Sequence, residues 1–263
     1  MLKRSIVAAL CILASVCAAG EAALRIGDAS NGAPLEEIQQ YALKLALSGK
    51  GEVGMRRILP SGAVAALKRG DFDVIVLDGR FAPAADSELT VRPYAAEALC
   101  VYVHPGNAAG SLTRKEVLEI LTAPRPVWSK YSPASADIQR IALKNDQPGG
   151  ALIYRMFGER NYAPEVFRVG TLAQLFMFLN ASSAGFAPFL AERPAEVIAL
   201  PIEDVAPSTA TVVSGRYPLT IRYLIVTGKR TSPLLTEFLD GIFSQESRKR
   251  LLDSGLLPIW EGR

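Results

Sequence analysis

The sequence has little cysteine and almost no histidine. Cys11, Cys17 and Cys100 are the three cysteines among its 263 residues, and His104 is the only histidine. A metal site built from clustered histidines is therefore excluded. A Ser-His-Asp triad would have to use His104, and no GxSxG motif presents a serine for it. These absences argue against an enzyme and predict neither a bound metal nor a cofactor.

Long apolar runs are also missing, except for a short one at the N-terminus. Residues 5–16, "SIVAALCILASV", are too few to span a bilayer. Lys3 and Arg4 precede this run and small residues follow it, which is the order typical of a signal peptide. We therefore expect a signal peptide over 1–22, cut between Ala18 and Ala23, and a periplasmic protein. An uncleaved anchor and a lipoprotein modified at Cys17 are less favoured alternatives, the latter because "ASV" is a poor lipobox.

Removal of that segment would leave Cys100 as the only cysteine, so no intramolecular disulfide could form. Cys100 lies in the apolar stretch "ALCVYV" and is expected to be buried. The formal charge would fall from +3 to +1, because Lys3 and Arg4 are lost. A nearly neutral chain without a basic cluster is not expected to bind nucleic acid.

The rest of the chain alternates short strand-like runs with amphipathic helical patterns, which favours an α/β fold with parallel sheets. Thr113 and Glu116 predict a capping box, as do Thr171 and Gln174, and Ser61 is expected to cap the helix that follows it. The main predicted strands are 24–27, 55–59, 72–78, 98–104, 139–144, 185–190, 196–202 and 217–228, and the main predicted helices are 34–48, 62–69, 114–122, 172–180, 233–244 and 245–255.

Four stretches together resemble the substrate-binding proteins of phosphate-type ABC transporters, which have the type II periplasmic-binding-protein fold. They are "AEALCVYVHPGNAAGSLTRKEVLEILTA", "KNDQPGGALIYRMFG", "SGRYPLTIRYLIVTGK" and "FLDGIFSQESRKRLLDSGLLPI". The resemblance implies two α/β lobes, each with a mostly parallel sheet and flanking helices, joined by two hinge strands. Lobe 1 would comprise 24–104 and 218–263, lobe 2 would comprise 105–217, and a ligand would lie between them.

In the family three turns hold an oxyanion through backbone N–H groups and hydroxyls. The resemblance places Ser30 on the first turn, and Ser61 and Gly62 on the second. On the third it places Lys144, Asp146, Gly149 and Gly150. There Pro148 replaces the family's serine and Gly150 its threonine, which removes two hydroxyls and one N–H. The turn would then hold an oxyanion more weakly, and we expect Gly150→Thr to restore a donor without strain.

Arg80 follows a predicted strand and is a further candidate for the cleft. Each assignment has a structural alternative. Ser61 could be only a helix cap, Arg80 could pair with Asp78, and Lys144 could pair with Asp146 in solvent. Tyr217 could line the cleft or pack at the hinge.

The function that the resemblance implies is that of an exported, monomeric solute-binding protein. It would capture a small inorganic oxyanion resembling phosphate and deliver it to the membrane permease of an ABC transporter. The alternative is a module with the same fold that has lost its ligand and acts in structure or signalling through a protein partner. A hydrolase is less favoured than either, because no nucleophile and base are paired in the sequence.

Overall fold

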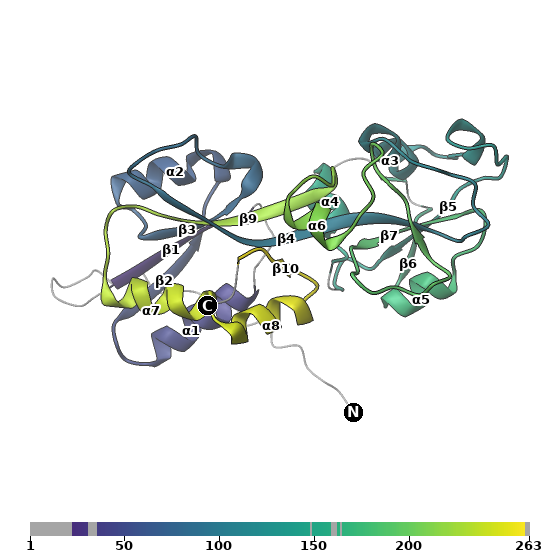
Figure 1. Ribbon diagram of the computed structural model, residues 1–263. Helices are drawn as coiled ribbons and strands as arrows, with labels where there is room; N and C mark the ends of the chain where they lie inside the picture. Colours follow the sequence, from purple (N-terminus) through teal and green to yellow (C-terminus); the bar gives the residue numbers. More distant parts are fainter. Residues whose placement is uncertain (1–22, 31–35, 148, 159–161, 164, 261–263) are drawn as a thin grey trace, which may run out of the picture.

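The computed structural model describes residues 23–30, 36–147, 149–158, 162–163 and 165–260. The chain forms an elongated α/β molecule with two lobes, and strand β4 runs from one lobe into the other (Figure 1). The strands are β1 (Ala23–Ala29), β2 (Glu52–Arg57), β3 (Val74–Asp78), β4 (Thr90–Val103), β5 (Gln139–Leu143), β6 (Phe167–Val169), β7 (Ser183–Pro188), β8 (Ile198–Ala199), β9 (Thr220–Thr227) and β10 (Leu257–Pro258).

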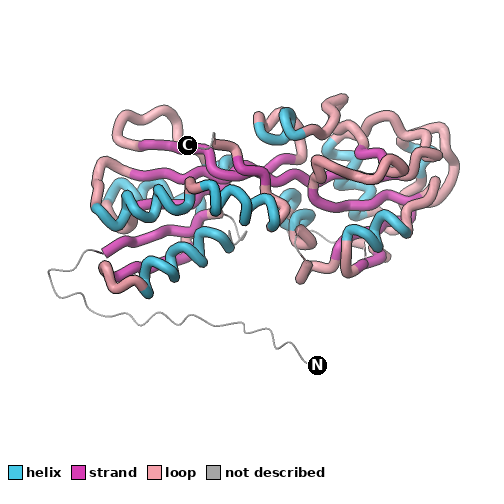
Figure 2. The backbone as a smooth tube through the Cα atoms, turned by 60° about the horizontal axis from the view of Figure 1, so that its bottom comes forward, coloured by secondary structure: helices cyan, strands magenta, loops and turns pink. Residues whose placement is uncertain are grey.

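Eight α-helices and two short 3₁₀ helices occur in the described ranges. The helices lie around a central band of strands (Figure 2). They are α1 (Glu36–Leu47), α2 (Pro60–Arg69), α3 (Arg114–Thr122), α4 (Leu152–Phe157), α5 (Leu172–Met177), α6 (Thr209–Val213), α7 (Pro233–Ile242), α8 (Gln245–Asp253), η1 (Gly79–Phe81) and η2 (Trp128–Lys130).

Hydrogen bonds connect the strands in the order β2-β1-β3-β9-β4-β7-β5-β6, with β8 and β10 also paired to β4. Strand β4 pairs with β9 as far as Ala98 and with β7 from Leu99 onward. The predicted α/β two-lobed fold is confirmed. The two predicted sheets are not separate, however, because β4 is long enough to supply a strand to both. The lobe boundaries at 104/105 and 217/218 stay a prediction.

Strand β3 shows how the first lobe is layered. Val74 and Val76 belong to the core that includes α1 and α7. Ile75 and Leu77 belong to a second core that includes α2. Successive side chains of a strand point to opposite faces, so a fully apolar strand requires helices on both faces of the sheet. Figure 1 shows α2 on one face of β1 and β3, and α1, α7 and α8 on the other.

The second lobe is built on β5, which is parallel to β6 and β7. Strands β7 and β8 are antiparallel to β4. Of the strand predicted at 196–202, only Ile198 and Ala199 pair with β4 and form a strand. Cys100, predicted to be buried, has no exposed surface.

The helix ends confirm one predicted capping box and correct two other predictions. Thr113 and Glu116 form both bonds of the box before α3. Ser61 does not cap α2, because the helix already begins at Pro60, a residue whose fixed φ suits the first helical position. Gln174 accepts a hydrogen bond from the Gly170 N–H, so it does not complete the box with Thr171.

The predicted signal peptide over 1–22, with Cys11 and Cys17, lies outside the described residues, as does Pro148. None of the helices in the described ranges has both the length and the hydropathy needed to cross a bilayer.

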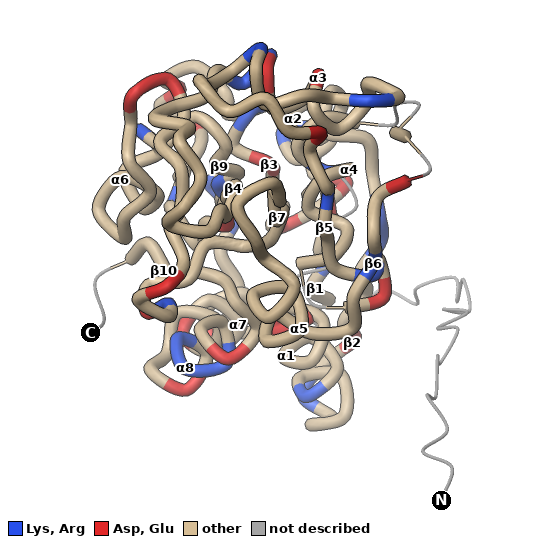
Figure 3. The backbone as a smooth tube through the Cα atoms, turned by 90° about the vertical axis from the view of Figure 1, so that its right-hand side faces the viewer, with Lys and Arg blue, Asp and Glu red and all other residues tan. Residues whose placement is uncertain are grey.

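Helix α8 carries basic and acidic residues next to one another on the outside of the first lobe (Figure 3).

Candidate functional site

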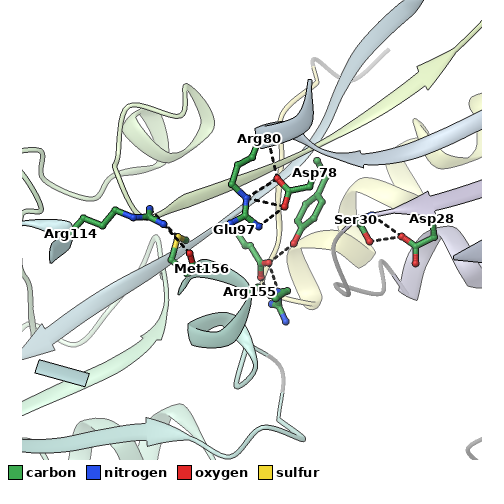
Figure 4. Close-up of polar contacts among 9 residues, drawn as sticks. Asp28, Ser30, Asp78, Arg80, Glu97, Arg114, Arg155 and Met156 are labelled. Carbon is green, nitrogen blue, oxygen red and sulfur yellow. Dashed lines mark hydrogen bonds and ion pairs between the residues drawn. The ribbon is translucent and has the colours of Figure 1, made fainter. Parts of the chain in front are cut away.

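Strands β1 and β3 end in carboxylates at the same edge of the sheet. Asp28 lies near the end of β1, followed by Ser30, and Asp78 ends β3, followed by Arg80. Because β1 and β3 are neighbouring parallel strands, their carboxyl ends meet, and this edge is where open α/β sheets bind ligands. Figure 4 shows Asp28 and Ser30 beside the cluster that contains Asp78 and Arg80.

Ser30 is 1% exposed, and it is hydrogen-bonded to Asp28. Its Oγ and its backbone N–H both donate to Asp28 Oδ1. Asp28 is also buried, and Arg57 Nε lies 3.7 Å from its Oδ2. The carboxylate of Asp28 opposes the approach of an anion to the Ser30 hydroxyl. Ligand contact by Ser30 stays a prediction.

Arg80 and Asp78 form a two-point ion pair, as one of the sequence alternatives expected. Arg80 Nε donates to Asp78 Oδ1 at 3.0 Å and Nη2 donates to Oδ2 at 2.6 Å. The Asp78 side chain is 1% exposed and that of Arg80 38%. The hydrogen bond to Asp78 raises the pKa of Arg80, so the guanidinium remains charged at the edge of the sheet.

A second two-point ion pair joins Arg155 of α4 to Glu97 of β4. Arg155 Nε donates to Glu97 Oε1 at 2.8 Å, and Nη2 donates to Oε2 at 2.6 Å. The Tyr223 hydroxyl also donates to Glu97 Oε1. Burial alone lowers the pKa of Arg155, and the bonds to Glu97 outweigh this, so the net shift is upward.

Arg114, the first residue of α3, is the third guanidinium of the cluster. Its Nη1 donates to Pro218 O at 3.1 Å. Its Nη2 donates to Met156 O at 2.9 Å (Figure 4). The guanidinium also lies 5.1 Å from the centre of the Phe157 ring. Among the described residues no carboxylate forms an ion pair with it. Burial and then the positive charge of Arg80 lower the pKa of Arg114.

These three arginines line one cavity of about 670 Å³. Arg80 comes from the first lobe, and Arg114 and Arg155 come from α3 and α4 of the second. The other lining residues are Lys115, Leu118, Met156, Phe157, Gly158 and Glu203. The cavity thus combines positive charge from both lobes with an apolar wall from the second.

A different cavity, of about 560 Å³, lies at the amino-terminal ends of β5 and β6. Arg140 lines it, but its guanidinium donates to the carbonyls of Ile120 and Ala123 at the end of α3. Parallel strands bind ligands at their carboxyl ends. We therefore assign the site to the cavity of Arg80, Arg114 and Arg155.

The described residues of the predicted turn at 144–150 do not line this cavity. Lys144 and Asp146 are exposed, and no ion pair joins them in the part of the chain that the structure describes. The N–H of Gly150 donates to Gln147 O at 2.8 Å, so it is already used within the turn. Gly149 has a φ of +75°. Binding of a ligand by this turn stays a prediction.

The expectation that Gly150 would accept a threonine is wrong. A Cβ atom at Gly150 would lie 1.8 Å from the backbone oxygen of Lys144. Contact at that distance with backbone cannot be relieved by a side-chain rotation. The glycine is required because the chain returns onto itself there, directly before α4.

Ser61 and Gly62 lie exposed in the first turn of α2, and Gly62 N–H donates to Leu59 O at 3.1 Å. Their contact with a ligand also stays a prediction. Tyr217 has no exposed surface, so it packs in the core and does not line the cavity. His104 is exposed and its Nδ1 accepts a hydrogen bond from the Gly106 N–H.

Of the predicted site residues, only Arg80 lines the cavity, and sequence reasoning missed Arg114 and Arg155. One signal could have indicated Arg155. It is the only charged residue in "ALIYRMF", and a charge within an apolar helix needs a partner. Arg114 follows a capping threonine, where a polar residue is ordinary, so its sequence position gives no such signal.

Solved structures of bacterial phosphate receptors share this fold. A possible phosphate-binding protein from Planctomyces limnophilus is 18% identical, with a TM-score of 0.70, covering 91% of this chain and 94% of that one. PstS from Borrelia burgdorferi is 15% identical, with a TM-score of 0.65 and coverage of 92% and 100%. An ABC-type phosphate transport receptor from Vibrio cholerae is 16% identical, with a TM-score of 0.59 and coverage of 90% and 100%.

No protein-family model matches the sequence, and no curated protein matches it either. The structural likeness confirms the predicted type II periplasmic-binding-protein fold. At these identities it establishes the fold and leaves the ligand open.

Proposed function

We propose that this chain is an exported, non-enzymatic solute-binding protein that captures a small oxyanion between its two lobes for the permease of an ABC transporter. One observation carries the proposal: guanidinium groups from both lobes line a single cavity at the carboxyl-terminal edge of β3. A ligand that contacts Arg80 and Arg114 together would favour the closed arrangement of the lobes. The names of the structures with this fold support a transport role.

Anion binding can be tested by thermal unfolding of the chain without residues 1–22 against phosphate, sulfate and small carboxylates. A binder gains about 2.7 kcal/mol of stability at a ligand concentration of 100 times its Kd. Arg114→Gln should remove the gain. Arg69→Gln is the matched control, because Arg69 is an exposed arginine of α2 paired with Asp71. A full gain in Arg114→Gln would refute the assignment of the cavity.

A module without a ligand is the second candidate function, and one observation favours it. Arg80 and Arg155 already hold the carboxylates of Asp78 and Glu97, so two of the three cations are neutralised by the chain itself. Such a module would act through a protein partner. It would gain no stability from any anion of the panel, which distinguishes it from the first candidate.

Export is tested separately, by expressing the full chain in a bacterium with an outer membrane and analysing the periplasmic fraction by mass spectrometry. We expect a soluble monomer that begins between Ala19 and Ala23. A lipid on Cys17, or an intact Met1, would contradict the predicted signal peptide. Neither result would affect the assignment of the anion cavity.

A further inference from the structure

Among the residues that the structure describes, the charges around the cavity leave a single uncompensated cation. Three guanidinium groups, of Arg80, Arg114 and Arg155, meet two buried carboxylates, of Asp78 and Glu97, so the inner cluster has a net charge of +1. Lys115 and Glu203, which also line the cavity, are both exposed and opposite in sign. One negative charge therefore balances the described charges of the site, whereas a doubly charged anion would remain undercompensated.

The uncompensated cation, the guanidinium of Arg114, also has an N–H group that donates to no described residue. Arg80 and Arg155 each bind a carboxylate through Nε and Nη2, the edge that matches the two oxygens of a carboxylate. Arg114 uses its Nη1 and Nη2 on the carbonyls of Pro218 and Met156, and its Nε donates to no described residue. Nη2 carries two N–H groups and donates one printed hydrogen bond, so the Nε edge of Arg114 keeps donors for an oxyanion from outside the chain.

The size and wall of the cavity indicate more than an inorganic ion. A volume of about 670 Å³ falls within the range of small-molecule pockets, roughly 300–1,000 Å³. Beside Arg114 the wall is formed by Leu118 of α3 and by Met156 and Phe157 of α4. Phe157 also lies under the guanidinium of Arg114. An apolar wall next to a cation fits a ligand with a charged end and an apolar body.

We propose that the ligand is an organic monoanion, a carboxylate with an aliphatic or aromatic body, whose charged end binds the Nε edge of Arg114 while its body packs on Leu118 and Phe157. This inference rests on the proposed function, because it specifies the class of solute that the same cavity captures. It predicts that binding tightens with the length of the apolar body. It also predicts that inorganic phosphate binds no better than acetate.

The test is isothermal titration of the chain without residues 1–22 with acetate, butyrate, hexanoate and inorganic phosphate, at one fixed ionic strength. Each buried CH₂ is worth about 0.8 kcal/mol, so the affinity should rise about fourfold per CH₂ from acetate to hexanoate. Arg114→Gln should weaken every carboxylate at least about tenfold. Arg69→Gln should leave all four titrations unchanged.

Leu118→Ala tests the apolar wall independently of Arg114. It should reduce the rise in affinity from acetate to hexanoate, and it keeps the test valid if Arg114→Gln does not fold. Circular dichroism of each variant confirms its fold.

Each outcome separates the inference from the proposed function. An affinity that does not change from acetate to hexanoate, or that is unaltered by Leu118→Ala, would overturn the organic monoanion. Binding of phosphate but not of hexanoate would overturn it as well and leave the proposed function intact. If none of the four probes bound, both would fail.

Discussion

Arg155 and Glu97 connect the two lobes through a two-point ion pair in which Glu97 is buried and Arg155 partly so. Arg155 lies on α4 of the second lobe, and Glu97 lies on the part of β4 that pairs with β9 of the first. Their side chains are 15% and 6% exposed. The Tyr223 hydroxyl supplies a third hydrogen bond, so the carboxylate is well compensated. The ion pair therefore fixes one wall of the cavity relative to the sheet.

Removal of one partner of this pair should be strongly destabilising. We expect Glu97→Gln to lower the free energy of unfolding by about 3–5 kcal/mol, because it leaves the mostly buried guanidinium of Arg155 without a counter-charge. Replacing both residues, as in Glu97→Leu with Arg155→Met, should recover most of that loss. Urea unfolding of Glu97→Leu, of Arg155→Met and of the double variant measures the coupling.

Lys50→Gln is the control for this cycle. Lys50 and Glu237 form an ion pair with side chains that are 57% and 38% exposed. Such surface pairs contribute about 0–1 kcal/mol. If Glu97→Gln cost no more than Lys50→Gln, the pair between Arg155 and Glu97 would not join the lobes in solution.

Glu37 gives a prediction of pH dependence. Burial raises the pKa of its carboxyl above the unfolded value of 4.5, although Arg250, whose Nη1 lies 3.6 Å from it, acts in the opposite direction. A raised carboxyl pKa contributes stability that is fully present below the unfolded pKa and is lost as the pH rises through the folded pKa. The wild-type protein should therefore exceed Glu37→Gln in stability by more at about pH 4 than at about pH 7.

Urea unfolding of both proteins at the two pH values measures this difference. Glu36→Gln is the matched control, because Glu36 is an exposed carboxylate in the same first turn of α1. An advantage of the wild type that grew towards neutral pH would show that the ion pair with Arg250 outweighs the cost of burial.

The local pattern of the sequence predicted most of the elements. The apolar run "VIVLD" and the capping box of Thr113 and Glu116 depend on neighbours in the chain, and both occur as expected. The sharing of β4 between two sheets could not be predicted. It depends on the pairing of Leu99 with Pro188 and of Ala98 with Thr220, which are distant in the sequence.

The candidate site was less predictable for the same reason. Arg80 was identified because it follows a predicted strand, and strand ends are common sites of ligand binding. Arg114 and Arg155 are brought beside it by the packing of α3 and α4, which no periodicity encodes. At Gly149 and Gly150 the sequence suggested a ligand site where the structure gives a structural reason for the glycines. Gly149 has a positive φ, and Gly150 lies too close to the backbone of Lys144 for a side chain. Either requirement selects glycine without any ligand.

Cys100 should be inert in the folded protein. Burial raises the pKa of its thiol from 9.0 to about 12, and the thiolate is the reactive form. The chain without residues 1–22 should not react with Ellman's reagent near pH 8, and it should show one reactive thiol after unfolding in guanidinium. Rapid labelling of the native protein would mean that β4 opens readily at the junction of the lobes.

The last prediction compares two glycines that the sequence assigned to the same kind of turn. Gly150→Ala should lower the free energy of unfolding by about 1–3 kcal/mol or more, because its Cβ would lie 1.8 Å from the backbone oxygen of Lys144. Gly62→Ala should instead raise it by about 0.5–1 kcal/mol. Gly62 lies within α2, a Cβ there meets nothing within 4 Å, and alanine restricts the unfolded chain. Urea unfolding measures both changes, and equal effects of the two substitutions would show that the chain does not make the close return at Lys144 on which this difference depends.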